Sequence, residues 1–347
     1  MFPALGMALG DWIKSMNTQL NPTGAFLAPG FSLRPLKWND ADAVAQLIYD
    51  ACVAEGDAIL AVSAEELKHE WQDPDFNPET DGFVVETTEG RIAGYDEIMN
   101  SYGHAILEMN GNVHPEFKGR GIGTTLLRAV EKRAREIMDF AEPDVRIAIK
   151  TTINRNDPDS VALHEHEGYR PIRYHWRMEI VLDGPPEAPK LPERIEIRPF
   201  IQAEHDVAVW QAENEAFRDH PGSHEWTLEE WQRARFDDPE FDPSLWAIAW
   251  DEEEVAGFSV NRYRTGIGWI RTLGVRRLWR KRGLGEALLT HSFGEYYRRG
   301  TLTIGLGVNA HNPTGATRLY QKVGMYPASE HVTYEKELRP GRDVEEE

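Results

Sequence analysis

The chain has 347 residues, a net charge of −20 at pH 7 and a single cysteine. This length is too great for one compact domain and comfortable for two, each able to bury its own core. The acidic balance argues against a nucleic-acid partner or an anionic membrane surface, because lysine and arginine supply phosphate affinity and are outnumbered here. A lone Cys52 excludes an intrachain disulfide and suits a reducing cytoplasm.

Residues 1–29 are predicted to form an N-terminal extension. The apolar residues 1–9 lack a positively charged leader, are followed closely by Asp11 and are too short to span a bilayer, which argues against a signal peptide. Pro22 and Pro29 favour a segment that is either disordered or packed on the body of the protein. We assign this extension no function.

A first domain is predicted over residues 30–182. Ser63 and Glu66 form a capping box that predicts the start of a helix, and Ile122 and Leu126 begin an apolar stripe that predicts a core-facing helix. In chain order, the patterns predict a strand at 31–36, helices ending at 54 and starting at 63, a hairpin over 83–98, a strand at 104–113, a helix from 122, a strand at 145–149, a helix at 157–166 and a strand at 173–181.

Residues 183–193 are too rich in proline for a helix or a central strand and are predicted to link two domains. The pattern then restarts, because IEIRPF at 195–200 echoes FSLRPL at 31–36. This duplication places a second domain over residues 194–347. Its predicted elements are helices at 204–216 and after 227, a hairpin over 245–263 and a strand at 269–275.

A glycine-rich loop in the second domain joins the strand that ends at Val275 to a predicted helix. In Arg280-x-x-Gly283-x-Gly285 the glycines remove side chains where the helix begins, so backbone N–H groups can approach a ligand. The unpaired N–H groups of a first helical turn favour an anion. The basic run at 276–282 stands out from the acidic chain. A phosphate or pyrophosphate is the expected ligand.

The same arrangement occurs in the first domain. Lys118-x-x-Gly121-x-Gly123 follows a strand that ends at Val113, with the same spacing from valine to cation and between the glycines. An isolated Gly-x-Gly is more simply a turn with solvated cations around it. The repetition of strand, spacer and glycines argues against that interpretation.

At these residues the chain resembles the GNAT superfamily of acyl-CoA-dependent acyltransferases, whose signature is Arg/Gln-x-x-Gly-x-Gly/Ala at the start of a helix. The resemblance covers nearly the whole chain as two copies, and Lys118 departs from the signature. It implies an α/β (α+β) fold of two tandem GNAT-like domains, each a mixed, largely antiparallel sheet flanked by helices. In this family the loop holds the pyrophosphate of CoA, and the preceding strand hydrogen-bonds the pantetheine arm. The residues that the resemblance implies for cofactor binding are Leu273, Gly274, Val275, Arg280, Lys281, Arg282, Gly283, Leu284, Gly285, Glu286 and Asn312 in the second copy, and Val113, Lys118, Gly119, Arg120, Gly121, Ile122, Gly123 and Asn156 in the first.

The second copy continues as the family does, with a strand, Asn312 and a Leu-Tyr-x-x-x-Gly-Met segment that contains Tyr320. In the family this asparagine touches CoA and the tyrosine hydroxyl protonates the departing thiolate, so the resemblance implies that Tyr320 is the catalytic general acid. The alternative role for Tyr320 is a core tyrosine on an amphipathic helix. In the first copy, which aligns without a gap, Asn156 stands opposite Asn312 and His164 opposite Tyr320. The first domain therefore lacks the expected acid and is predicted to be non-catalytic or degenerate.

Two further site assignments follow from the residues. His164 and His166 lie two positions apart on a predicted helix and diverge, so we expect no metal site. The general base stays open among Glu108, Glu213, Glu215 and a water molecule.

These features predict an N-acyltransferase that depends on acyl-CoA, with acetyl-CoA as the first choice of donor and the amine of a small molecule as acceptor. The second domain is expected to be catalytic, by direct attack of the neutral amine on the thioester. The tandem arrangement is similar to that of the mycothiol synthases, whose C-terminal half is active, but other tandem members share these features, and the acidic chain also suits a cationic amine or an aminoglycoside. We expect a monomer or homodimer in the cytoplasm, with no nucleic-acid or membrane partner.

A non-catalytic CoA-binding regulatory or scaffold protein is the alternative function. Tyr320 favours the enzyme over this alternative. Dinucleotide binding does not fit, because neither copy has Gly-x-Gly-x-x-Gly with an acidic residue about twenty positions later.

Overall fold

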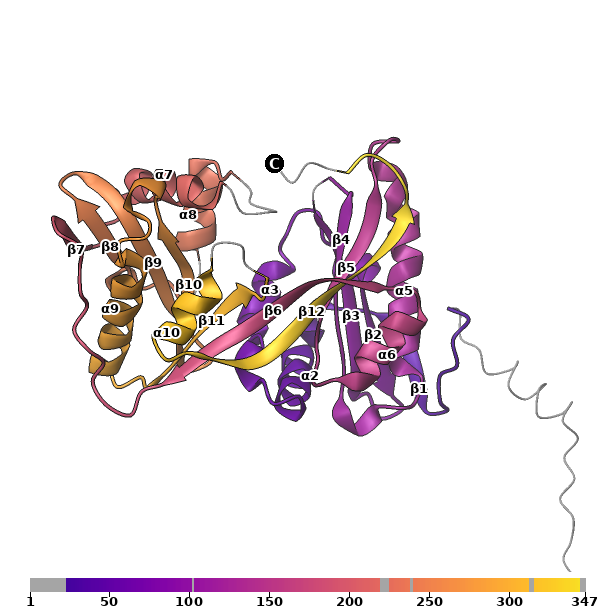
Figure 1. Ribbon diagram of the computed structural model, residues 1–347. Helices are drawn as coiled ribbons and strands as arrows, with labels where there is room; N and C mark the ends of the chain where they lie inside the picture. Colours follow the sequence, from indigo (N-terminus) through magenta and orange to yellow (C-terminus); the bar gives the residue numbers. More distant parts are fainter. Residues whose placement is uncertain (1–22, 102, 219–224, 238–239, 312–314, 344–347) are drawn as a thin grey trace, which may run out of the picture. The chain divides into compact units, whose positions relative to one another are not determined.

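The computed structural model describes residues 23–101, 103–218, 225–237, 240–311 and 315–343 (Figure 1). Contacts within the chain group these residues into two compact units, which we describe separately. The first unit holds the chain as far as Ile172 and again from Val332, and the second unit holds Arg173–His331. Both units combine a mixed sheet with helices, so the predicted fold class is confirmed.

The first unit follows the predicted order of elements. They are β1 (Phe31–Pro35), α2 (Ala41–Ala54), α3 (Ala64–Glu70), α4 (Pro78–Asp81), β2 (Gly82–Thr87), β3 (Ile92–Ser101), β4 (Ile106–Val113), α5 (Ile122–Ile137), β5 (Ile147–Asn154), α6 (Pro158–His166), the start of β6 (Arg170–Val181) and the end of β12 (Tyr326–Arg339). β1 to β4 pair antiparallel in sequence, and β4 pairs parallel with β5. In the strand order of the sheet, β12 follows β5.

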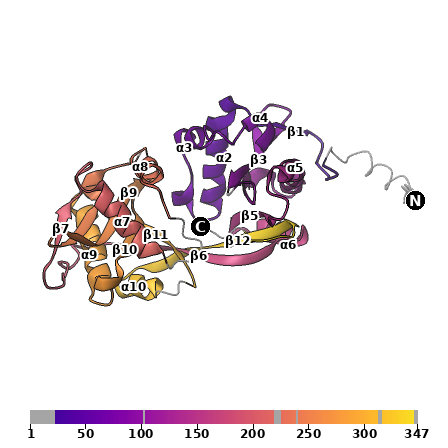
Figure 2. The same ribbon diagram turned by 90° about the horizontal axis from the view of Figure 1, so that it is seen from above.

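Helices α2 and α5 cover opposite faces of this sheet (Figure 2). Val84 packs in a cluster with Leu47 of α2, whereas the next residue, Val85, packs in a cluster with Ile122 of α5. Successive side chains of a strand point to opposite faces, so the two clusters lie on the two sides of β2. The helix that follows the first glycine loop is thereby fixed on one face of the sheet.

Two local predictions are confirmed in this unit. The Ser63 hydroxyl accepts a hydrogen bond from the Glu66 amide, and the Glu66 carboxylate accepts one from the Ser63 amide, which completes the capping box of α3. Ile122, Leu126 and the rest of the predicted stripe of α5 are buried. The short helix α4 was not predicted.

The second unit repeats this order of elements. They are β7 (Ile195–Pro199), α7 (Asp206–Phe217), α8 (Leu228–Phe236), β8 (Ala247–Asp251), β9 (Glu254–Arg264), β10 (Ile267–Val275), α9 (Leu284–Arg298), β11 (Thr303–Asn309), α10 (Ala316–Lys322), the remainder of β6 and the start of β12. β7 to β10 pair antiparallel in sequence, β10 pairs parallel with β11, and β11 pairs antiparallel with β6. The alanines of β8 pack with α9, whereas Ile248 and Trp250 pack with α7.

The sixth strand of each unit comes from the other copy of the duplicated sequence. β12, at the end of the second copy, follows β5, and β6, at the end of the first copy, pairs with β11. Residues 175–181 of β6 make this pairing with β11 in the second unit. The end of β12 belongs to the first unit, where the Thr333 and Thr152 hydroxyls are 3.0 Å apart and Arg146 binds Glu335 and Glu337. The domain boundaries predicted at 182 and 194 therefore do not coincide with the two units. A strand joins the sheet that satisfies its backbone N–H and C=O groups, and chain order does not decide which sheet that is.

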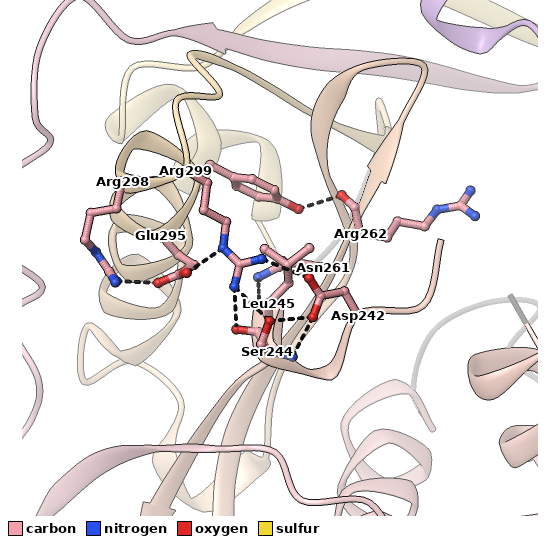
Figure 3. A network of polar contacts seen from close by, with 9 residues as sticks. Asp242, Ser244, Leu245, Asn261, Arg262, Glu295, Arg298 and Arg299 are labelled. Atoms are coloured by element: carbon pink, nitrogen blue, oxygen red, sulfur yellow. Dashed lines mark hydrogen bonds and ion pairs between the residues drawn. The ribbon is translucent and has the colours of Figure 1, made fainter. Parts of the chain in front are cut away.

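A polar network fixes the C-terminal end of α9 (Figure 3). The Arg299 guanidinium binds Glu295 at 2.6 Å and Asp242 at 2.9 Å. The Tyr296 hydroxyl donates a hydrogen bond of 2.6 Å to the carbonyl oxygen of Arg262 on β9. These contacts tie the helix to the sheet and so set the direction of its opposite end, where the second glycine loop lies.

Candidate functional site

The second glycine loop has the backbone that its sequence predicts. Gly283 is the residue before α9 and has φ of 84°, in the left-handed region that favours glycine. Apart from the adjoining residues of the chain, no described atom lies within 4 Å of the position that a Cβ of Gly283 would occupy. Gly283 is therefore required by the turn, and the side of the loop that its Cβ would face is open among the described residues.

Gly285 is glycine for a different reason. A Cβ at this position would lie 3.1 Å from Cδ2 of Leu319 and 3.8 Å from Cγ2 of Val275. Val275 is the last residue of β10, and Leu319 precedes Tyr320 on α10. The glycine loop, the end of the strand and the tyrosine helix therefore meet at Gly285.

The strands that flank this point separate from one another. β10 pairs with β11 only at Gly268↔Ile304 and Trp269↔Gly305, although both strands continue for several residues. On its other side β10 stays paired with β9 as far as Val275, with a register shift between Ile270 and Thr272. Residues 272–275 are therefore paired with β9 along one edge. Along the other edge they pair with no strand in the described part of the chain. That edge carries the backbone groups predicted to bind the pantetheine arm.

Tyr320 lies on α10 with its ring in the main core cluster of the second unit. The residue is 8% exposed, and burial is the only influence on its pKa, with no hydrogen bond from another described group to its hydroxyl. Burial raises the pKa of Tyr320 to about 12, so the hydroxyl is neutral at pH 7. The ring therefore has the packing of a core tyrosine, while the hydroxyl is free to donate a proton.

The predicted cofactor-binding residues of the second copy divide into those that hold the loop and those that reach solvent. Arg280 donates to the carbonyl oxygens of Val275 at 3.0 Å and Ala216 at 2.9 Å, so its side chain fixes the loop. Lys281 and Arg282 are exposed. Three of the remaining residues have packing roles: Leu284 is buried, Leu273 packs in the core, and a Cβ on Gly274 would collide with the Phe258 ring. The Glu286 carboxylate binds Lys322 at 2.5 Å. Asn312 lies outside the described residues.

Two of the glutamates considered as general base are held by arginine. Glu213 is buried, accepts a hydrogen bond of 2.8 Å from Trp231 Nε1 and is paired with Arg235. Glu215 is bound to Arg276 at 2.7 Å. Glu108 is exposed on β4 of the first unit. Both carboxylates considered in the second unit are therefore already engaged by a cation.

The first glycine loop has nearly the same geometry. Gly121 precedes α5 with φ of 80°, and a Cβ on Gly123 would lie 3.1 Å from Leu163 and 3.6 Å from Val113. The polar groups around it differ, because Lys118 is bound to Asp157 at 2.8 Å. The other predicted residues lie in the same loop and its flanks: Gly119 and Arg120 in the turn, Ile122 buried at the start of α5, and Asn156 with its amide donating to the carbonyl oxygen of Glu55 at 3.0 Å.

His164, opposite Tyr320 in the alignment, is a packed side chain. Its Nδ1 donates to the carbonyl oxygen of Ser160 at 2.7 Å, and its ring meets Tyr169 edge-on. Burial lowers the pKa of His164, which keeps the imidazole neutral at pH 7. These contacts support a structural role for this histidine.

The structure also shows two features that sequence reasoning missed. One is the register shift around Arg271, for which the sequence carries no signal. The other is the contact of residues 24–28 with the first loop. The apolar residues Ala25 and Leu27 at alternate positions could have indicated a packed segment, but not its partner. Among the described residues, no group of histidine, cysteine and acidic side chains could hold a metal ion, and no helix is long and apolar enough to cross a membrane.

Comparisons with known proteins agree on one family. The model of the acetyltransferase (GNAT) family matches residues 48–169 and 207–325, once in each half. The mycothiol acetyltransferase of Kineococcus radiotolerans is 31% identical over 326 residues, which cover 90% of this chain and 97% of that protein. A GCN5-related N-acetyltransferase from Sphaerobacter thermophilus has a crystal structure with a TM-score of 0.78 and 36% identity, covering 92% of this chain and 99% of that one. A tandem GNAT protein from the clavulanic acid biosynthesis pathway shares the fold, with a TM-score of 0.67, 19% identity and coverage of 90% and 100%.

Proposed function

This chain belongs to the acetyltransferase (GNAT) family and is an N-acetyltransferase with two tandem GNAT domains, and we propose that its second unit transfers the acyl group of an acyl-CoA to the amine of a small molecule. The observation that carries this proposal is the meeting of three parts at Gly285. There the open glycine loop, the unpaired edge of β10 and the helix of Tyr320 come together.

The residues present fit an acyl-CoA. Backbone N–H groups at the N-terminal end of α9 suit a diphosphate, and the exposed Lys281 and Arg282 add positive charge beside them. The free edge of residues 272–275 suits the amide groups of a pantetheine arm. When bound, acyl-CoA supplies the thioester that is the source of the acyl group. Acetyl-CoA is the donor that we propose, in keeping with the names of the relatives.

The chain's own groups supply positioning, polarisation and a proton. A backbone amide of residues 273–275 polarises the thioester carbonyl, which stabilises the negative charge that develops there. The acceptor amine attacks in its neutral form and passes its proton to water, because Glu213 and Glu215 are held by arginine. Tyr320 donates its hydroxyl proton to the departing sulfur and then regains a proton from solvent, which has taken the proton of the amine. Its raised pKa places this transfer late in the step, when the charge on sulfur is greatest.

The acceptor that we propose is a small amine. The relative named mycothiol acetyltransferase makes an amine of the mycothiol type the first compound to test. The net charge of −20 also suits a cationic acceptor, which gives aminoglycosides the second place. Catalysis is preferred over the non-catalytic CoA-binding alternative because the relatives are named as acetyltransferases.

Release of free CoA tests the proposal. The purified chain is incubated with acetyl-CoA and a panel of amines that includes cysteine-linked amino sugars, aminoglycosides and simple diamines, and the liberated thiol is followed. Acceptor thiols are measured in parallel without acetyl-CoA, and the acetylated product is identified by mass. Turnover with one amine class, lost in Tyr320→Phe, is the expected result. Binding of acetyl-CoA without turnover on any amine would support the scaffold alternative.

A further inference from the structure

Residues 24–28, which we name the strap, lie against the glycine loop of the first unit. A Cβ added to Gly121 would collide with the carbonyl oxygen of Phe26. The amide of Ala28 donates a hydrogen bond of 3.1 Å to the carbonyl oxygen of Arg120. The carbonyl oxygen of Gly24 accepts one of 3.1 Å from Arg128 on α5. The strap is therefore attached to the loop itself and to the helix that the loop begins.

Alternate side chains anchor the strap in one register. Ala25 and Leu27 are buried, whereas Phe26 between them is 43% exposed. Leu27 packs in a cluster with Ile122 and Leu126, the residues that start α5. Burial of the Leu27 side chain removes apolar surface from water and so favours the attached state of this short segment.

The strap presents an oxygen where an anion is expected. The N-terminal end of a helix carries a partial positive charge and free N–H groups, which attract an anion. In the first unit the Phe26 carbonyl oxygen already contacts Gly121 at this end of α5. A diphosphate would meet both a steric obstacle and an electronegative atom there.

The cation of the same loop is also neutralised. Lys118 Nζ lies 2.8 Å from Asp157 Oδ2, and the Asp157 carboxylate also caps α6 by accepting from the Ser160 amide. Paired with this carboxylate, Lys118 brings no net positive charge to the loop for a phosphate to bind. In the second copy the alignment places Pro313 opposite Asp157, so no carboxylate is present in that position of the sequence.

The two loops thus share a backbone but differ in what surrounds them. Gly121 and Gly283 both have φ near 80°, yet only Gly121 has a described neighbour within 4 Å of its Cβ position. We infer that the strap and Asp157 close the first unit to acyl-CoA, so that each chain binds one acyl-CoA, in the second unit. This inference rests on the proposed function of the second loop.

Binding stoichiometry tests the inference in the full chain. Isothermal titration calorimetry with acetyl-CoA is carried out on the wild type, on Gly285→Leu, which blocks the second loop, and on Gly285→Leu combined with Leu27→Asp and Asp157→Asn, which expels the strap from its cluster and removes the carboxylate. Phe26→Ala in the Gly285→Leu background is the matched control, since it shortens an exposed side chain and keeps the strap anchored. Circular dichroism establishes that each variant is folded. Leu27→Ala with Asp157→Asn replaces Leu27→Asp if the latter does not fold.

The expected result is one site in the wild type, none in Gly285→Leu, and one regained when the strap is released but not in the Phe26→Ala control. Two sites in the wild type, or one that survives Gly285→Leu, would overturn the inference and leave the proposed function standing. A folded, strap-released chain that regains no site would overturn it as well. A wild type without any site would remove the proposed function together with the inference.

Discussion

Gly285 lies against Leu319, with a Cβ at position 285 placed 3.1 Å from the leucine Cδ2. The first unit repeats this contact between Gly123 and Leu163, also at 3.1 Å. In each unit, the glycine therefore determines how closely the helix that carries this leucine, α10 or α6, approaches the glycine loop. The residue after this leucine is Tyr320 in the second unit and His164 in the first.

Replacing Gly285 with leucine is expected to abolish acyl-CoA binding. The new side chain must displace Leu319 or enter the loop, and either outcome removes the close approach of backbone N–H groups to a ligand. We expect an affinity loss of at least about tenfold, or roughly 1.4 kcal/mol, by calorimetry. Gly123→Leu is the matched control and should leave turnover intact in folded protein. Unchanged affinity in Gly285→Leu would contradict the assignment of this loop.

Replacing Tyr320 with phenylalanine is expected to lower kcat and leave the fold intact. The ring supplies the packing, and the hydroxyl has no described hydrogen-bond partner to lose. We expect kcat to fall by about 10²–10⁴-fold, as for the loss of a general acid. Acyl-CoA affinity and the melting temperature should stay near those of the wild type.

Tyr296→Phe is the control for Tyr320→Phe. The Tyr296 hydroxyl donates to the Arg262 carbonyl oxygen at 2.6 Å and accepts from the Trp269 amide at 3.2 Å, so its loss leaves buried backbone groups unpaired. This should cost about 1–3 kcal/mol of stability with no selective loss of turnover in folded protein. If Tyr320→Phe behaved in the same way, Tyr320 would be a core tyrosine.

Glu213→Ala tests whether Glu213 is a catalytic base or a carboxylate with a purely structural role. Glu213 and Arg235 are both buried and paired with each other, so removal of the carboxylate leaves a buried guanidinium without its counterion. We expect a loss of about 3–5 kcal/mol in unfolding free energy. Turnover per folded molecule should be unchanged, measured at a temperature where the variant is folded. A selective fall in kcat at full folding would identify Glu213 as the base.

The stability of the protein is expected to depend on pH through Glu97. This side chain is buried, with Trp71 Nε1 donating to its carboxylate at 2.9 Å, and burial raises its pKa to about 7 from the ordinary value of 4.5. Between these values the unfolded chain loses the proton while the folded chain keeps it, so rising pH favours the unfolded state. As the pH rises through this range, the free energy of unfolding falls by roughly 3 kcal/mol, and this fall is complete above about pH 7.

Glu97→Gln tests this dependence by urea unfolding at several pH values. The glutamine keeps an acceptor for Trp71 and cannot ionise. The variant should match the wild type near pH 4 and exceed it in unfolding free energy at pH 8. A difference between the two proteins that stays constant from pH 4 to pH 8 would show that Glu97 is ionised in the fold throughout.

The sequence by itself determined the local parts of this protein. The spacing of Gly283 and Gly285 predicted a loop that starts a helix, and the structure has it, because a left-handed turn and a close approach each require glycine at a fixed position. The capping box at Ser63 and the stripe on α5 were predicted for the same reason, since the groups involved lie within two turns of each other. Duplication of these local signals identified two copies of one fold, and the match of the family model in each half agrees.

Only the tertiary structure decided which distant groups meet. The sequence could not indicate that β6 pairs with β11, that Glu213 is held by Arg235, or that Phe26 contacts Gly121. Each of these pairings joins residues that are far apart in the chain, and several other partners of the same chemical type were available for each group. A periodic pattern records only which face of an element is buried. The partner on that face is selected by the free energy of the whole fold, through backbone pairing, burial and charge together.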